Sequence, residues 1–179
     1  SSVVCTLFEG SYHLGLAALV NSLHRAGFRE TVFAGYRGPL PNWAMAAVPF
    51  ACRGWSDANV LTIDSGLRIV FLPLVTEHHL TNFKPEFMLS VLDGPALRAE
   101  SIFYLDPDIC VTAPWAFFEQ WVSCGVALCE DLNSPLPEQH PRRVGWRRYY
   151  AGHGMQLRFR GSEYVNGGCV GLRVRDRKF

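Results

Sequence analysis

The first 36 residues carry the pattern that most restricts the fold, because a strand, a helix and a second strand follow one another there. Residues 3–8 form a β-type run, and apolar residues then recur at helical spacing over residues 14–26, before a glycine that ends the pattern. Residues 31–36 have the composition of a second strand. A helix long enough to cross over between two strands favours a parallel sheet with helices on its faces. The opening therefore predicts an α/β fold with a mostly parallel sheet.

Later segments extend this predicted sheet. Strands are expected at residues 67–72, 101–105, 125–129 and 164–173, with 125–129 as a buried strand. Helices are expected at 82–92 and 115–122, with a short one after Pro41 through Trp43. Residues 49–58 show no clear period, and residues 133–162, rich in proline, arginine and aromatic residues, predict a long ordered loop or lid.

Size and composition exclude several classes of protein. A chain of 179 residues favours a single domain, and a net charge of +1 with 18% charged residues gives no sign of a nucleic-acid-binding protein. No apolar stretch is long enough to cross a membrane. The six cysteines form no Cys-x-x-Cys pair and are expected to be reduced, buried thiols of a cytoplasmic protein. Both chain ends are abrupt, which suggests a piece of a longer protein, truncated on its C-terminal side.

The strand at residues 101–105 runs directly into two carboxylates, Asp106 and Asp108. In extended chain, residues two apart point to the same face, and Pro107 biases Asp106 towards an extended conformation. Two like charges so close repel each other unless a cation lies between them, and a hard divalent cation prefers such oxygen ligands. The pair therefore indicates a metal site; the alternative is an ordinary solvated turn, since Asp and Pro are common turn residues.

Polar residues also follow other predicted strands. Phe8-Glu9-Gly10 and Glu130-Asp131 stand, like the Asp106-Pro107-Asp108 segment, where a strand ends. In open α/β sheets, ligands gather at the carboxyl ends of the strands. Three polar clusters at one edge of a sheet favour a ligand site there, although each alone is compatible with an ordinary loop.

Four short blocks spread along the chain share one resemblance. They are Cys5-Thr6-Leu7-Phe8 with Tyr12-His13-Leu14-Gly15, then Lys84-Pro85, then Tyr104-Leu105-Asp106-Pro107-Asp108, and finally Asp131 with Tyr164-Val165-Asn166-Gly167-Gly168. In this order they resemble the GT-A glycosyltransferases of family 8, the glycogenin-like and lipopolysaccharide galactosyltransferase-like group. The resemblance spans nearly the whole chain and implies one Rossmann-like, nucleotide-sugar-binding domain over residues 1–179, with an incomplete catalytic domain.

The resemblance also implies a role for each matching residue. Thr6 and Leu7 would line the nucleotide base, partly through their backbone, and Tyr12 would stack on uracil. Lys84 would contact phosphate or sugar oxygens. Asp106 and Asp108 would hold Mn²⁺ or Mg²⁺ on the diphosphate. The remaining residues, Asp131 and Asn166, would contact the donor sugar.

The chain departs from the family pattern in two respects. Glu9 stands where the family often has a small polar residue, so the base contacts differ. The family's later Gly-Asp-Gln and His-x-x-Gly-x-x-Lys-Pro segments, the second of which usually supplies a third metal ligand and a phosphate-binding lysine, are absent.

Two functions follow as expectations. The first is a metal-dependent, retaining glycosyltransferase that uses a nucleotide sugar, with UDP as the nucleotide, and an acceptor that the sequence does not identify. The second is a catalytically incompetent GT-A-like domain that serves as a binding or interaction module. A sugar nucleotidyltransferase is disfavoured, because Glu9-Gly10-Ser11-Tyr12 is not the Gly-rich basic loop that such enzymes carry after the first strand.

Overall fold

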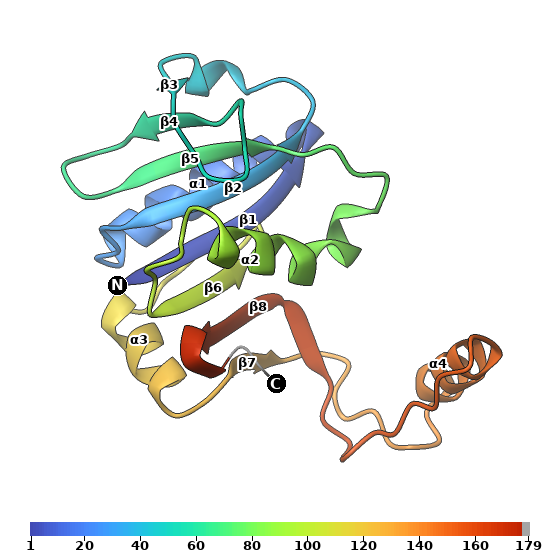
Figure 1. Ribbon diagram of the computed structural model, residues 1–179. Helices are drawn as coiled ribbons and strands as arrows, with labels where there is room; N and C mark the ends of the chain where they lie inside the picture. Colours follow the sequence, from blue (N-terminus) through green and yellow to red (C-terminus); the bar gives the residue numbers. More distant parts are fainter. Residues whose placement is uncertain (177–179) are drawn as a thin grey trace. The chain divides into compact units, whose positions relative to one another are not determined.

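The computed structural model describes residues 1–176, whose strands form one mixed sheet (Figure 1). The strand order is β3-β4-β5-β2-β1-β6-β8-β7. Its parallel centre consists of β5 (Arg68–Pro73), β2 (Thr31–Arg37), β1 (Ser2–Glu9) and β6 (Ser101–Leu105). The outer strands are β3 (Val48–Pro49), β4 (Asn59–Thr62), β8 (Val165–Arg173) and β7 (Ala127–Glu130). The predicted α/β class, with a mostly parallel sheet flanked by helices, is confirmed.

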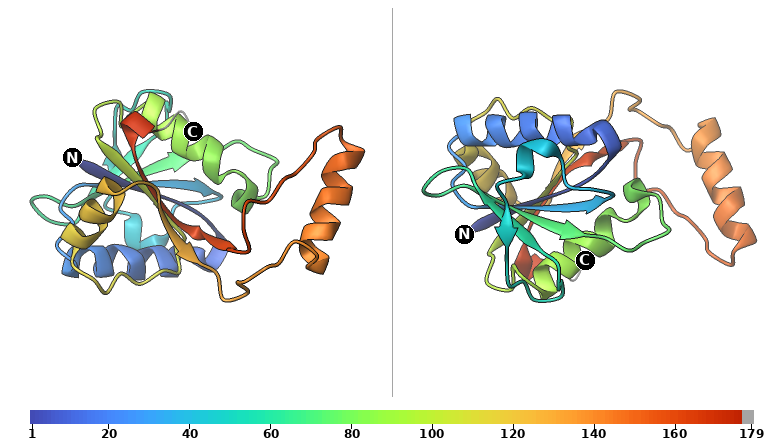
Figure 2. Two further views of the ribbon diagram at one scale, coloured as in Figure 1. Left: turned by 90° about the horizontal axis from the view of Figure 1, so that it is seen from below. Right: turned by 90° about the horizontal axis from the view of Figure 1, so that it is seen from above.

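Three helices cover the parallel strands (Figure 2). Helices α1 (His13–Arg25) and α3 (Trp115–Ser123) lie on one face, and α2 (Lys84–Asp93) lies on the other. Because β1 has a side-chain period of two, Cys5 and Leu7 pack in the core cluster under α2 with Phe87 and Val91. On the other face, the Phe103 ring packs edge-on against Trp115 of α3, with ring centroids 4.9 Å apart. The sheet is thus buried on both sides, as its apolar strands predict.

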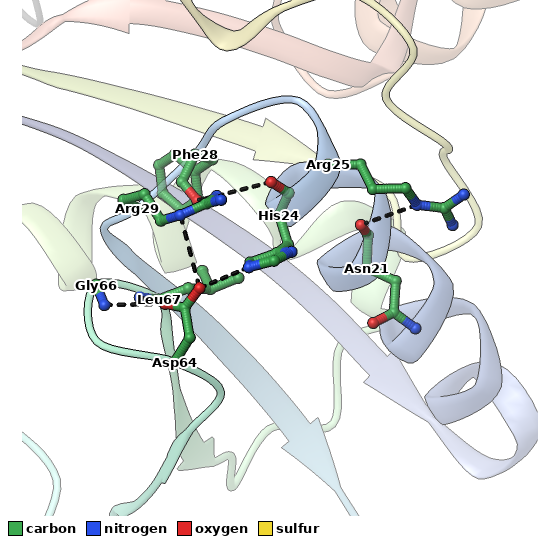
Figure 3. A network of polar contacts seen from close by, with 8 residues as sticks. All are labelled: Asn21, His24, Arg25, Phe28, Arg29, Asp64, Gly66 and Leu67. Atoms are coloured by element: carbon green, nitrogen blue, oxygen red, sulfur yellow. Dashed lines mark hydrogen bonds and ion pairs between the residues drawn. The ribbon is translucent and has the colours of Figure 1, made fainter.

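A polar network around Asp64 lies at the amino-terminal ends of the parallel strands β2 and β5 (Figure 3). Oδ1 of Asp64 accepts hydrogen bonds of 2.9 Å from the backbone amides of Gly66 and Leu67, which closes the turn between β4 and β5. Oδ2 lies 2.5 Å from Nε2 of His24, in the last turn of α1, and 3.6 Å from Nε of Arg29. One carboxylate therefore joins a helix end to a strand turn.

The contacts of the chain cluster into two compact units. The first comprises residues 1–127 and 168–179, of which 177–179 lie outside the described part, and the second comprises residues 128–167. The second unit contains α4 (Pro141–Gly152). Its only buried helical residue is Arg143, whose guanidinium donates hydrogen bonds to the carbonyl oxygens of Gly161 and Glu163 and lies over the Phe159 ring.

Three of the expected elements differ in the structure, and two strands were not expected. Residues 133–162 are not a continuous loop, because α4 begins at Pro141 and its first turn is capped by Nδ1 of His140. This helix has no apolar stripe, so the periodicity could not reveal it. Strand β7 starts later than expected and is mostly exposed, because it is the last strand of the sheet. The expected helix near Trp43 is a single 3-10 turn, Asn42–Ala44, and β3 and β4 were not expected.

The cysteines are also less buried than expected. Cys5 and Cys169 are buried, as a core role requires. Cys52 and Cys129 are partly exposed, and Cys110 and Cys124 are exposed. All six are free thiols, so the expectation of buried thiols holds for only two of them.

Candidate functional site

A cavity of about 220 Å³ opens at the carboxyl ends of β1 and β6, which are adjacent and parallel. The end of β1 supplies Leu7, Phe8 and Glu9, and Tyr12 follows in the 3-10 turn before α1. These residues form the first wall. The second wall consists of the segment before α2 and Lys84, the first residue of α2. The third wall consists of the end of β6 and the loop that follows it. These two walls consist of His79, Leu80, Thr81, Lys84, Tyr104, Asp106, Pro107 and Asp108. Five of the eight residues expected at the site thus line one cavity.

The loop that carries both carboxylates is held by backbone contacts. The Asp106 amide donates to the carbonyl oxygen of Gly168 (2.7 Å), and the Ile109 amide donates to the carbonyl oxygen of Asp106 (3.0 Å), which closes a turn. Pro107 is buried against the first turn of α1, where a Cβ on Gly15 would lie only 2.7 Å from the Pro107 carbonyl oxygen. Glycine at position 15 therefore permits the close approach of the loop to the helix.

Asp106 is the centre of the polar contacts in the cavity. Its Oδ1 lies 2.7 Å from Nζ of Lys84 and accepts a hydrogen bond of 3.0 Å from the Tyr104 hydroxyl. Burial, with a further contribution from Asp106, raises the pKa of Tyr104 above its usual range, so this hydroxyl stays a neutral donor. The Lys84 ammonium also lies 4.9 Å from the centre of the Tyr104 ring.

The position of Lys84 is locally unfavourable. It is the first residue of α2, where the helix dipole disfavours a cation, and its side chain is only 15% exposed. Asp106 compensates for this by direct pairing. A cation held against local preference at the edge of a cavity is typical of a site rather than of a packing residue.

Two carboxylates and a lysine at one cavity suit an anionic ligand with a hard cation. Asp108 is exposed and Asp106 is partly exposed, so both can contact a ligand. Within residues 1–176, no group of three or more His, Cys, Asp or Glu side chains is arranged to hold a metal ion. A cation there would take its other ligands from a bound molecule or from water, which is how Mg²⁺ commonly binds beside phosphates.

The remaining expected residues lie elsewhere. The Thr6 side chain is fully buried outside the cavity lining, and its hydroxyl has no hydrogen-bond partner among the described residues. Asp131 and Asn166 lie together in the second unit, where Oδ2 of Asp131 accepts from Nδ2 of Asn166 at 3.2 Å. The amide and side chain of Asn133 lower the pKa of Asp131, with smaller contributions from Asn166 and Arg142. The two residues expected to contact the sugar therefore contact each other.

His79, Leu80 and Thr81 line the cavity without having been expected there. Nδ1 of His79 accepts a hydrogen bond of 3.3 Å from the Thr81 amide, which fixes the ring at the start of the 3-10 turn Leu80–Asn82. The adjacent histidines give no metal-ligand spacing in the sequence. Their closeness to Lys84 in the sequence is the only feature that could have indicated that these three residues line the cavity.

Comparisons with known proteins identify the fold. No protein-family model and no curated protein matches the chain. Among solved structures, the galactosyltransferase LgtC in complex with donor and acceptor sugar analogues matches 99% of this chain and 60% of its own, with a TM-score of 0.53 and 15% sequence identity. An active-site mutant of LgtC, Q189E, matches 99% of this chain and 59% of its own, with a TM-score of 0.55 and 16% identity.

The likeness defines the class of fold. The chain has a GT-A-like glycosyltransferase fold, and it spans about three fifths of the length of these LgtC structures. At this level of identity, the likeness shows the fold alone. None of the helices in the described part is both long and apolar enough to cross a membrane.

Proposed function

We propose that this chain is the donor-binding part of a metal-dependent glycosyltransferase, which transfers a sugar from a nucleotide sugar to an acceptor with retention of configuration. The nucleotide is UDP in this proposal. The observation that carries it is the contact between Lys84 and Asp106 at a cavity that Asp108 and Tyr12 also line. The glycosyltransferase-like fold supports it, because ligands of such sheets bind at the carboxyl ends of the parallel strands.

The cavity offers separate surfaces for the two parts of a nucleoside diphosphate. Tyr12 is 56% exposed, so its ring suits a flat, apolar base, and Leu7, near the end of β1, lines the same cavity and offers its backbone. Lys84 suits the phosphates. Helix α1 begins beside the cavity with no acidic residue in its first turn, so its positive end also favours an anion. Thr6 contributes to this base site only through its backbone, because its side chain is buried.

The Asp106 and Asp108 carboxylates fit a divalent cation, Mn²⁺ or Mg²⁺, that is shared with the diphosphate. When bound, such an ion neutralises the negative charge on the departing phosphate. Lys84 assists the same step, since its side chain is held in a partly buried position where it would contact the departing phosphate. Tyr104 donates to Oδ1 of Asp106 and so orients the carboxylate. We extend the proposal to Asp131 and Asn166 as contacts of the donor sugar.

One observation favours the alternative function, a GT-A-like binding module without catalysis. Oδ1 of Asp106 already has two partners, Lys84 and Tyr104, and the described residues provide no third metal ligand. In this alternative, Lys84 takes the place of the cation, and a nucleotide binds without metal.

The experiment is calorimetric titration of UDP with and without Mn²⁺. The transferase proposal expects Mn²⁺ to tighten UDP binding at least tenfold, and expects Asp106→Asn and Asp108→Asn each to abolish the gain. Asp57→Asn is the matched control, because Asp57 is exposed and outside the cavity lining. UDP affinity that does not change with Mn²⁺ supports the module, whereas no binding of UDP under either condition rejects both the transferase and a UDP-binding module.

A further inference from the structure

Arg37 links two walls of the donor cavity without lining it. It is the last residue of β2 and stands in register with Glu9, the last residue of β1. Its Nη2 lies 2.7 Å from Oε2 of Glu9. Its Nη1 donates to the carbonyl oxygens of Thr76 (3.2 Å) and His78 (3.4 Å). One guanidinium therefore holds Glu9 and the backbone that leads to His79, both of which line the cavity.

Arg37 is partly buried, so its contacts cannot easily be replaced by water. Its side chain is 28% exposed, and its Nε is buried with no hydrogen-bond partner within residues 1–176. A guanidinium is a planar fork that fixes the groups it binds, and lysine cannot reproduce this geometry. Without Arg37, the Glu9 carboxylate loses its cationic partner and the segment at 76–78 loses its attachment to β2.

The hydrogen-bonding properties of the Glu9 carboxylate suggest why Arg37 holds it in place. A carboxylate can only accept hydrogen bonds, and one oxygen of Glu9 is already paired with Arg37. Uracil presents a ring N–H at its pairing edge, which suits the second oxygen. Cytosine presents a ring nitrogen lone pair at the same position, and this lone pair repels a carboxylate. The two bases have nearly the same size, so the edge alone distinguishes them.

We propose that Arg37 is a positioning residue that orients Glu9 towards the base and thereby favours uracil over cytosine nucleotides. The inference rests on the proposed function, because it takes the cavity as the donor site. Glu9 lines the same cavity as Tyr12, the residue expected to stack on the base. Arg37 does not line the cavity, and its effect on the base is exerted through Glu9.

The test is a double-mutant cycle that compares the binding of UDP and CDP in the presence of Mn²⁺. The wild type is expected to bind UDP at least tenfold more tightly than CDP. Both Glu9→Gln and Arg37→Met should reduce this ratio to about threefold or less, because glutamine can also donate to cytosine. In the Glu9→Gln background, Arg37→Met should leave the ratio unchanged, since there is no carboxylate left to orient.

Two further variants separate positioning from general support of the fold. Arg37→Lys keeps a cation for Glu9 but loses the fork, and should restore part of the UDP preference. Arg68→Met is the matched control: Arg68 hydrogen-bonds to Thr31 at the other end of β2, and its loss should leave the ratio unchanged. Equal UDP and CDP affinities in the wild type, or additive effects in the cycle, overturn the inference alone. Failure of the wild type to bind either nucleotide overturns the proposed function as well.

Discussion

The ammonium nitrogen of Lys84 lies 2.7 Å from Oδ1 of Asp106, so the first residue of α2 is joined to the residue that follows β6. Both groups face the same cavity. The pair brings a cation to the oxygen that a metal ion would use. In the proposed function, Lys84 and a metal ion would compete for Asp106, and both would contact the diphosphate.

Replacing Lys84 with methionine should affect the two ligands in opposite directions. Mn²⁺ alone should bind several-fold more tightly, because Asp106 loses its competing cation. UDP in the presence of Mn²⁺ should bind about tenfold more weakly, since a charge-assisted contact is worth ~1.5–3 kcal/mol. Electron paramagnetic resonance measures the first quantity and calorimetry the second. If both affinities fell together, Lys84 would be a structural partner of Asp106 only.

Tyr12 should contribute its ring and not its hydroxyl. Stacking on a nucleobase is worth about 1–3 kcal/mol by alanine substitution, so Tyr12→Ala should weaken UDP binding by about tenfold or more. Tyr12→Phe should bind UDP like the wild type. Calorimetry with both variants checks this, and equal losses in the two would assign the effect to the hydroxyl.

Gly15 should be intolerant of a side chain. An alanine Cβ would lie 2.7 Å from the Pro107 carbonyl oxygen, and relieving such overpacking costs ~1–3 kcal/mol. Gly15→Ala should lower the free energy of unfolding in urea by that amount and reduce the Mn²⁺ enhancement of UDP binding. Gly145→Ala is the matched control, because that helical glycine has open space, and should gain ~0.5–1 kcal/mol. An unchanged Gly15→Ala protein would contradict the close approach.

Stability at low pH should depend on Asp64. The amides of Gly66 and Leu67 lower the pKa of Asp64 from 3.8 to about 2, with a further contribution from His24. A depressed pKa means that the ionised carboxylate stabilises the folded state, and this contribution is lost as the pH falls from about 4 towards 2. The urea midpoint of the wild type should therefore fall across that window more steeply than that of Asp64→Asn. Parallel curves for the two proteins would rule out Asp64 as the cause.

The four arginines of helix α4 divide into two whose side chains make contacts inside the second unit and two that are exposed. Arg143 is buried, and Arg147 donates to the Glu138 carbonyl oxygen (2.7 Å) and lies over the Phe159 ring. Arg142 and Arg148 are exposed, and we propose that these two side chains bind the acceptor through hydrogen bonds.

The double variant Arg142→Ala, Arg148→Ala should lower sugar transfer more than tenfold and leave UDP affinity nearly unchanged. Transfer of labelled sugar to a panel of saccharide acceptors, with the full-length protein, measures the first quantity. Unchanged transfer by an active wild type would remove the second unit from the acceptor site.

The parallel centre of the sheet could be predicted because its strands and helices carry strong periodic signals. The α1 pattern and the apolar run that ends at Leu105 are long enough to define their elements. Helix α4 could not be predicted, since its single buried residue is an arginine. Strand β3 has two exposed residues, so neither length nor alternation marks it.

The candidate site was predictable where residues lie within a few positions of a strand end. Tyr12 and Asp108 fulfil this condition, and both line the cavity. Lys84 was expected only from the resemblance, because its pairing with Asp106 depends on packing of distant segments. The contact between Arg37 and Glu9 depends on strand register, which the residue types alone do not fix.

The segment of residues 128–167 has a consequence for protein engineering. Near its two ends, the Asp131 amide donates a hydrogen bond to the Tyr164 carbonyl oxygen (2.8 Å), and the internal contacts of the segment form a compact unit of their own. A segment that closes on itself in this way is suited to exchange between homologues as a cassette. Chimaeras in which residues 131–164 come from a homologue would keep the cavity with Lys84 and Asp106, because none of the residues that line it lies in the exchanged segment.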